Sequence, residues 1–442
     1  MELITTTMGL LTLIPLGFMF FFFASRSPLG ALSLPSVTAM TSAIYFYVMP
    51  AVSLASGDDR FLGMRLTSLE WVHAVVLLYI LGALAAFLVF RRAFLINPAA
   101  PRPDEGRLNG LSLGFLWVLT IAMIVSQVEL GRLNLLGSRN YELNADTSGQ
   151  LSFLGEGYNL LVPLTLIFLI RRNFSLPSLL LLAPVLFVLA QAGFRFRIMI
   201  LLAAVTVAFL LLRRIRIRAS LIFLGATAGL FLVNLLGSVR RYGEGIDLSG
   251  LQDVQWRTFF SSFGGEIGIV YVTSYVAGSP LPDLALFQPW LVGFARLVPS
   301  FLWPDKPMPD YLSPIIGGFT AAGVERAGIA PPQQVEMLLQ FGWLGVPMLA
   351  FLYFAIATLL IGRLSRLSRE ARLAGIAIAP AFFGYYMQSR GYFFQIFADS
   401  LFFFAPCFLV SSRRARRAAP PSPSGARTGM VLSPDRSRVP LR

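Results

Sequence analysis

Residues 193–218 read GFRFRIMILLAAVTVAFLLLRRIRIR, and this stretch decides the fold class. Its centre, residues 198–212, is apolar on nearly every face of a helix, and arginines flank it on both sides. A strand of a membrane barrel would instead alternate apolar and polar residues over about 10 positions. Because a helix satisfies its own backbone hydrogen bonds in lipid, the stretch predicts a membrane-spanning helix.

Comparable apolar runs recur along the whole chain. Of its 442 residues, 56% are hydrophobic and 13% are charged, and the mean hydropathy is +0.70, whereas a soluble domain carries about 25% charged residues. We therefore predict an all-α, polytopic transmembrane protein over residues 1–417, with about eleven spans and a range of ten to thirteen. The expected spans are 4–24, 31–55, 70–90, 111–128, 152–170, 177–193, 198–212, 219–238, 338–361, 373–389 and 393–411. Residues 258–277 fit a further helix or a re-entrant segment equally well.

The arginine clusters set the expected orientation. With eleven spans they all fall on one side of the membrane, which holds 23 of the 36 basic and 4 of the 22 acidic residues. The positive-inside rule makes that side the cytoplasm. We therefore expect a bacterial inner-membrane protein with a cytoplasmic C-terminus. This segregation also explains the formal net charge of +14 without nucleic acid as a partner.

Two segments are expected to lie outside the bilayer. Residues 239–337 form one long periplasmic loop, and their Trp256, Trp290 and Trp303 suit the aromatic belt at the membrane surface. Residues 418–442 are rich in Pro, Ser, Gly and Arg and are typical of a disordered cytoplasmic tail.

Several kinds of chemistry are excluded by what the sequence lacks. The lone lysine, Lys306, lies in a Pro-Asp-Lys-Pro segment and belongs to no phosphate-binding loop, which argues against ATP-driven transport. Cys407 is the only cysteine, so no cysteine-based metal cluster is possible and we expect no metal site or cofactor. The single histidine, His73, is expected near the outer end of its span as an interfacial structural residue.

Arginines at outer helix ends are the candidate binding residues. Arg195 and Arg197 occupy an expected tight outer turn, Arg240 and Arg241 follow another helix end, and Arg139 lies in an outer loop. Their planar forks of donors match phosphate, so arginines that converge from several helices would suit a pyrophosphate. The alternative is that these side chains only anchor helix ends by reaching the lipid headgroups.

Carboxylates in apolar surroundings are the candidate proton acceptors. Glu266 lies in the glycine-rich segment near residue 265, and Glu336 begins a helix. Either carboxylate could deprotonate a hydroxyl, and the sequence does not choose between them. For Glu336 the alternative is pairing with the helix dipole. For Asp399, inside the last span, it is an ion pair with an arginine such as Arg390.

Two motifs carry a resemblance to a known family. Residues 298–307 read VPSFLWPDKP, and residues 336–345 read EMLLQFGWLG. Together with the GFR start of the 198–212 helix, they resemble the bacterial O-antigen and capsule repeat-unit polymerases, the Wzy family, over about half of the chain. The sequence has Ser300 where the family pattern has arginine, and Arg296 lies one helical turn earlier.

The resemblance implies a glycosyltransferase of the C type with an extracytoplasmic active site. Such enzymes transfer a glycan from undecaprenyl pyrophosphate to a new lipid-linked repeat unit, in the synthesis of lipopolysaccharide O-antigen, capsule or exopolysaccharide. The candidate pyrophosphate-binding residues would then be Arg139, Arg195, Arg197, Arg240, Arg241, Arg296 and Lys306. Membrane lipids, a chain-length regulator and a flippase are the implied partners.

Three other functions compete with this one. An O-antigen ligase would share the donor and the arginines, but such ligases usually carry a histidine in the outer loop, and residues 239–337 contain none. A transporter of lipid-linked sugars would place its charged residues at mid-membrane on broken helices, often in repeated halves. A non-catalytic scaffold would account for the hydropathy but not for the outer arginines.

Overall fold

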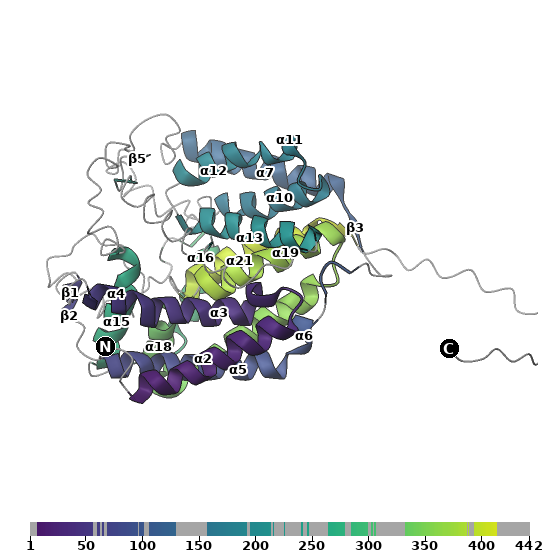
Figure 1. Ribbon diagram of the computed structural model, residues 1–442. Helices are drawn as coiled ribbons and strands as arrows, with labels where there is room; N and C mark the ends of the chain where they lie inside the picture. Colours follow the sequence, from purple (N-terminus) through teal and green to yellow (C-terminus); the bar gives the residue numbers. More distant parts are fainter. Residues whose placement is uncertain are drawn as a thin grey trace, which may run out of the picture.

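The computed structural model is a bundle of helices that lie roughly along one direction (Figure 1). It describes residues 7–55, 60–61, 64–65, 69–95, 97–100, 106–129, 157–191, 195–213, 215, 225, 240–241, 245–246, 264–278, 284–298, 302–303, 305, 332–386, 388 and 393–412. The longer helices are α2 (Thr7–Arg26), α3 (Leu34–Ala43), α5 (Leu69–Val89), α7 (Gly110–Glu129), α10 (Tyr158–Arg171), α12 (Leu182–Gln191), α13 (Arg195–Arg213), α15 (Gly264–Gly278), α16 (Gln288–Leu297), α18 (Gln333–Leu364), α19 (Arg369–Ala379) and α21 (Phe393–Leu409).

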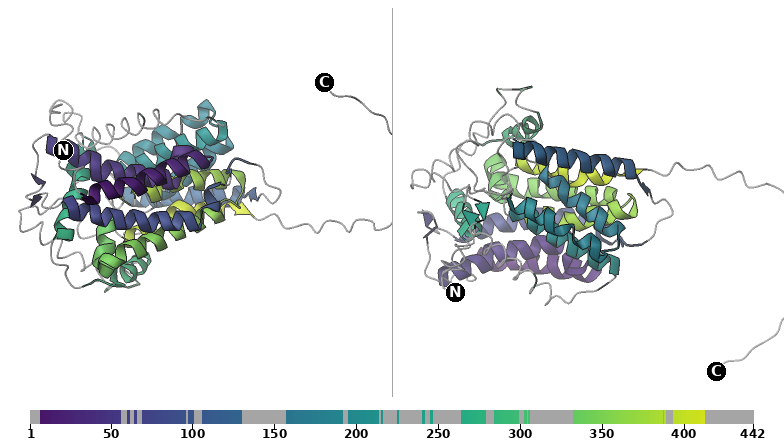
Figure 2. Two further views of the ribbon diagram at one scale, coloured as in Figure 1. Left: turned by 60° about the horizontal axis from the view of Figure 1, so that its bottom comes forward. Right: turned by 90° about the horizontal axis from the view of Figure 1, so that it is seen from above.

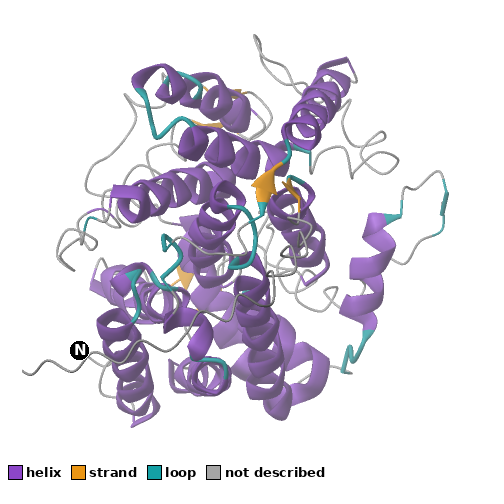
Figure 3. Cartoon of the chain, turned by 90° about the vertical axis from the view of Figure 1, so that its right-hand side faces the viewer, coloured by secondary structure: helices purple, strands orange, loops and turns teal. Residues whose placement is uncertain are grey.

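Shorter elements complete the described chain. They are η1 (Gly30–Leu32), the π-helices η2 (Ile44–Val48) and η5 (Pro380–Tyr386), and the short α-helices α4 (Met49–Ala55), α6 (Arg92–Leu95) and α11 (Leu176–Leu179). Strands of two residues pair β1 (Arg60–Phe61) with β2 (Met64–Arg65), β3 (Arg107–Leu108) with β6 (Ser411–Ser412), and β4 (Arg240–Arg241) with β5 (Gly245–Ile246). Helices therefore dominate every view, including the end-on one (Figure 3).

The apolar helices agree with a membrane protein. Among the described residues, Thr7–Arg26, Leu69–Val89, Phe196–Arg213 and Gln333–Leu364 are long and apolar enough to cross a bilayer, and five shorter helices are also apolar. The predicted all-α membrane class is confirmed at this level. Most of the predicted span 219–238, the long loop and the tail 418–442 lie outside the described residues.

Basic residues gather at one end of the bundle. One small cavity is lined by Ser27, Ala93 and Ser365, among others. Arg26, Arg92 and Arg363 closely precede these three residues in the sequence. The elements α6 and β3 lie at this end, on the right of Figure 1, whereas α4, α15, β1 and β2 lie at the opposite end. Three of the predicted cytoplasmic arginine clusters therefore approach one end of the bundle, whereas Arg60 and Arg65 lie in β1 and β2 at the opposite end.

The centre of the bundle is packed through aromatic rings and one close helix contact. Phe354 of α18 packs against Tyr79 and Phe87 of α5, with ring centroids 5.7 and 4.9 Å apart. A Cβ atom at Gly82 would lie 2.2 Å from the backbone oxygen of Pro347, so only glycine allows α5 and α18 to approach this closely. On the other side of the bundle, α7 lies beside α21 (Figure 2, right).

Helix α18 is broken where the sequence predicts a simple helix start. Phe341 and Gly342 have non-helical backbone angles, and Gly342 has φ 67° and ψ −159°, a conformation that only glycine adopts readily. Gln333 and Ile356 nevertheless line the same small cavity, although a straight helix would separate them by about 34 Å. The segment 333–341 therefore folds back against the rest of α18 as a re-entrant arm.

The re-entrant arm and the rest of α18 form a helical hairpin. The segment that precedes α16 binds the turn of this hairpin. The backbone N–H groups of Ala285 and Leu286 donate to the carbonyl oxygens of Leu339 and Gln340, at 2.9 and 3.0 Å. These carbonyl oxygens end the re-entrant arm, where no following helical turn supplies N–H groups to donate to them. The other end of the arm lies deep in the bundle, because Tyr79, midway along α5, donates its hydroxyl hydrogen to Gln333 Oε1 at 2.9 Å.

Candidate functional site

The structure describes two of the predicted site side chains, those of Arg197 and Glu336. Arg139 and Lys306 lie outside the described residues. Arg195 begins α13, Arg240 and Arg241 form β4, Glu266 lies near the start of α15 and Arg296 near the end of α16. The side chains of these five residues also lie outside the described part of the chain.

Arg197 lies inside the bundle rather than in a turn at its surface. The predicted tight turn 194–197 is corrected, because Arg197 belongs to the first turn of α13 and is 1% exposed. Its Nε donates to Asn159 Oδ1 of α10 at 2.6 Å. A guanidinium that reached into the lipid headgroups would remain exposed, so headgroup anchoring does not describe Arg197.

A hydrogen-bond chain connects Arg197 to Asp399. Asn159 Nδ2 donates to Asp399 Oδ1 at 2.7 Å, and the Tyr386 hydroxyl donates to Asp399 Oδ2 at 2.6 Å. Asn159 and Asp399 are both 0% exposed, and so is Tyr386. The chain therefore joins α13, α10, α21 and the π-helix η5, an element type that is frequent at functional sites. The predicted ion pair of Asp399 with Arg390 lies outside the described residues.

Aromatic rings enclose the guanidinium. Arg197 Cζ lies 5.6 Å from the centroid of Tyr158 and 5.1 Å from that of Phe196. Phe196 also stacks on Tyr386, with ring centroids 4.1 Å apart. Cation–π contact and the nearby carboxylate both stabilise a positive charge that has left water. We call Arg197, Asn159, Tyr386 and Asp399 the arginine network.

A second polar cluster lies between the two arms of α18. A cavity of about 30 Å³ is lined by Gln333, Glu336 and Gln340 of the re-entrant arm and by Tyr353 of the following arm. Glu336 is 1% exposed, and Trp290 Nε1 of α16 donates to Gln340 Oε1 at 3.0 Å. We call this space the hairpin cavity. It places a carboxylate beside buried amide side chains inside the bundle.

A chain of aromatic contacts connects the two clusters. Tyr353 lines the hairpin cavity and packs against Phe383, 5.7 Å away between ring centroids. Phe383 contacts Phe382 at 4.9 Å, and Phe382 contacts Tyr386 of the arginine network at 5.6 Å. The hairpin cavity and the arginine network are therefore linked through Phe383 and Phe382.

Sequence reasoning missed the uncharged members of both clusters. Asn159, Gln333 and Tyr386 lie in apolar helices, where no charge draws attention to them. The sequence feature that could have revealed the second cluster is the group of three glutamines around Glu336, namely Gln333, Gln334 and Gln340. Such amides are costly to bury unless they are hydrogen-bonded, so they indicate a polar interior site.

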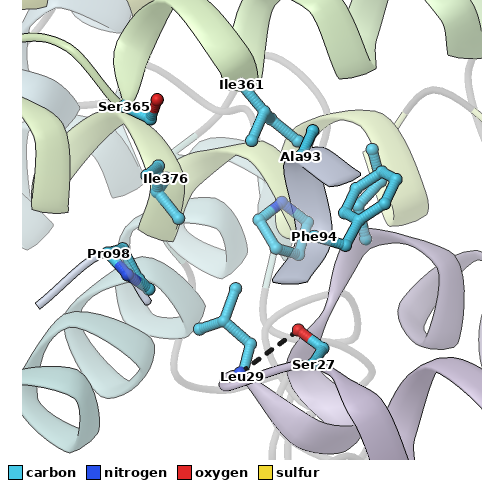
Figure 4. A pocket seen from close by; sticks show the side chains of 10 residues that line it. Ser27, Leu29, Ala93, Phe94, Pro98, Ile361, Ser365 and Ile376 are labelled. Atoms are coloured by element: carbon cyan, nitrogen blue, oxygen red, sulfur yellow. Dashed lines mark hydrogen bonds between the residues drawn. The ribbon is translucent and has the colours of Figure 1, made fainter. Parts of the chain in front are cut away.

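The other buried polar residue of interest, His73, and the second cavity carry fewer groups that could bind a ligand or react. His73 Nε2 lies 3.4 Å from the carbonyl oxygen of Phe46, and the ring stacks on Tyr47 at 4.7 Å. Figure 4 shows a cavity of about 20 Å³ at the basic end, lined mainly by apolar side chains such as Phe94 and Ile376. Within the described residues, no group of three or more His, Cys, Asp or Glu side chains could hold a metal ion.

The chain matches no protein-family model, no curated protein and no solved structure. A function is therefore argued from the chemistry of the arginine network and the hairpin cavity.

Proposed function

We propose that this protein polymerises lipid-linked oligosaccharide repeat units on the periplasmic face of the bacterial inner membrane. The observation that carries the proposal is the buried carboxylate of Glu336 beside a cavity, which a chain of aromatic contacts links to a buried arginine network. A scaffold has no use for either group, since burying charge in an apolar bundle is costly. The proposal includes eleven spans, a long periplasmic loop and a cytoplasmic C-terminus.

The reaction needs a proton acceptor and a leaving group. The acceptor hydroxyl oxygen attacks the anomeric carbon of the donor glycan, and the bond between that carbon and the pyrophosphate oxygen breaks. The electron pair leaves with undecaprenyl pyrophosphate, and the hydroxyl proton passes to the Glu336 carboxylate. Asp399 is not the proposed proton acceptor, because both of its oxygens already accept hydrogen bonds from Asn159 and Tyr386.

The arginines would act on the leaving group. Arg139, Arg195, Arg240, Arg241, Arg296 and Lys306 are the proposed pyrophosphate ligands, since donors placed at a developing negative charge lower the barrier most effectively. Arg197 is assigned a positioning role, because its Nε is engaged by Asn159. A chain-length regulator and a flippase are the proposed partners, and nucleic acid has no role.

The polysaccharide of a deletion strain separates this function from its competitors. Loss of a polymerase leaves lipid A core that carries a single repeat unit, seen as a collapsed ladder on a gel. Loss of a ligase instead leaves bare core with long chains on the carrier lipid, and loss of a transporter leaves repeat units on the cytoplasmic leaflet. Either of the last two patterns would refute the proposal.

The role of Glu336 is tested by complementation with E336Q, which keeps the shape and removes the proton acceptor. We expect the ladder to be lost, with a rate reduction of about 10²–10⁴-fold, the usual contribution of general base catalysis. E70Q is the matched control, because Glu70 is an exposed glutamate at the start of α5. A normal ladder with E336Q at wild-type expression would exclude Glu336 as the base.

A further inference from the structure

Two residues that line the hairpin cavity carry polar atoms that no described residue satisfies. Tyr353 and Gln333 line it, and these residues are 9% and 2% exposed. Neither Tyr353 Oη nor Gln333 Nε2 has a hydrogen-bond partner within the described part of the chain. Buried polar atoms are almost always paired in folded proteins, so two orphan atoms beside one cavity point to a bound hydrogen-bonding group.

The chemistry of the lining selects a neutral hydroxyl. The Gln333 amide nitrogen can only donate, a Glu336 carboxylate oxygen can accept, and the Tyr353 hydroxyl can do either. Among the described residues, no Lys or Arg side chain lines the cavity to hold an anion, and a cation would meet the donor face of Gln333. A hydroxyl group both donates and accepts, so it satisfies the amide and the carboxylate at once.

The size and position of the cavity restrict the ligand further. A volume of about 30 Å³ holds one hydroxyl or hydroxymethyl group rather than a whole sugar. Leu352 and Ile356, also in the lining, are 41% and 51% exposed on the outside of the bundle. The cavity therefore lies at the lateral surface, and the rest of a ligand would extend towards Trp290, whose ring suits the C–H face of a pyranose.

We propose that the hairpin cavity binds a hydroxyl-bearing pyranose, the terminal sugar of the acceptor, which approaches from the bilayer side. Tyr353 and Gln333 orient the hydroxyl, and Glu336 lies in the same cavity to receive its proton. The identity of the sugar as the acceptor rests on the proposed function, whereas binding of a pyranose needs no turnover. Residues 336–345, which form one of the two sequence motifs, contribute one wall of this cavity and the turn of the α18 hairpin.

Saturation-transfer NMR on the full chain in nanodiscs without glycolipid tests the binding. The probes are methyl β-glucopyranoside and methyl β-galactopyranoside, with glycerol as a polyol that resembles a lipid headgroup. We expect transfer to ring protons of at least one pyranoside and none to glycerol. Y353F should weaken that binding by roughly three- to tenfold, as the loss of one hydrogen bond does. It should fold normally, because Tyr353 Oη has no described partner.

The matched control is Y275F, which removes the hydroxyl of a tyrosine on α15 that is 39% exposed. Its binding should equal that of the wild type. Transfer to glycerol as strong as to the pyranosides would overturn the proposal in favour of a lipid headgroup site. Absence of transfer to any probe, or equal transfer in Y353F, would overturn it in favour of trapped water. Because polymerisation is scored separately on gels, pyranoside binding without polymerase activity would refute only the proposed function.

Discussion

Asp399 lies within an apolar helix and accepts hydrogen bonds from two other elements. We predict that D399N lowers the free energy of unfolding by about 1.5–3 kcal/mol, because hydrogen bonds to a charged group are worth that much. The substitution also removes the negative charge at the end of the chain that leads to Arg197. The unfolding midpoint of the purified protein in detergent measures the effect.

The control for D399N is D305N, since Asp305 is exposed. Surface substitutions of this kind usually change stability by less than about 0.5 kcal/mol. If D399N were as stable as D305N, the arginine network would contribute nothing measurable to folding. Loss of stability without loss of the polysaccharide ladder would confine the network to a structural role.

At the residue scale, the sequence indicated which charged residues are important, but not which side chains surround them in the fold. The sequence singled out Arg197 and Glu336, and both have fully buried side chains. It predicted a surface turn for Arg197, however, because the flanking apolar run suggested that the helix began later. Asn159 is the residue that brings Arg197 inside, and a lone asparagine in an apolar run carries no such signal.

The break in α18 governs the hairpin cavity at the element scale. We predict that G342A destabilises the protein by about 1–3 kcal/mol, because alanine is strained at φ 67° and ψ −159°. Disruption of the turn should also reduce pyranoside binding by the cavity. Thermal unfolding and the saturation-transfer measurement check both effects.

Gly362 provides a matched control within the same helix. A Cβ atom there meets nothing within 4 Å, so G362A should be neutral or stabilising by about 0.5–1 kcal/mol through helix propensity. Equal effects of G342A and G362A would contradict a sharp turn at Phe341–Gly342. The sequence predicted a span beginning at 338, and hydropathy alone could not detect a turn built from apolar residues.

The close contact between α5 and α18 depends on Gly82, because glycine has no side chain. We predict that G82A costs about 1–3 kcal/mol, the usual cost of overpacking, since its Cβ would lie 2.2 Å from the Pro347 oxygen. Gly114 of α7 has open space around its Cβ position, so G114A is the control. Comparable unfolding midpoints for the two variants would mean that the helices can separate at no cost.

At the scale of the whole molecule, the apolar runs of the sequence were sufficient to predict the all-α membrane class. Apolar runs predicted helices at nearly every described span, and α2, α10, α13 and α18 each have an arginine in the last turn. The fold-back of α18 and the association of α13, α10 and α21 around Asp399 depend on long-range contacts. Local sequence patterns do not encode such contacts.

The orientation in the membrane can be tested with the native cysteine left in place. Cys407 is 0% exposed, so an impermeant maleimide should leave the wild-type protein unlabelled in intact cells. We expect D305C to be labelled in intact cells, because Asp305 is exposed on the predicted periplasmic side. R366C, exposed at the basic end, should react only after the membrane is opened, since positive charge marks the cytoplasmic side. The reverse pattern would place Glu336 and the arginine network out of reach of a periplasmic donor, and polymerisation on that face would be impossible.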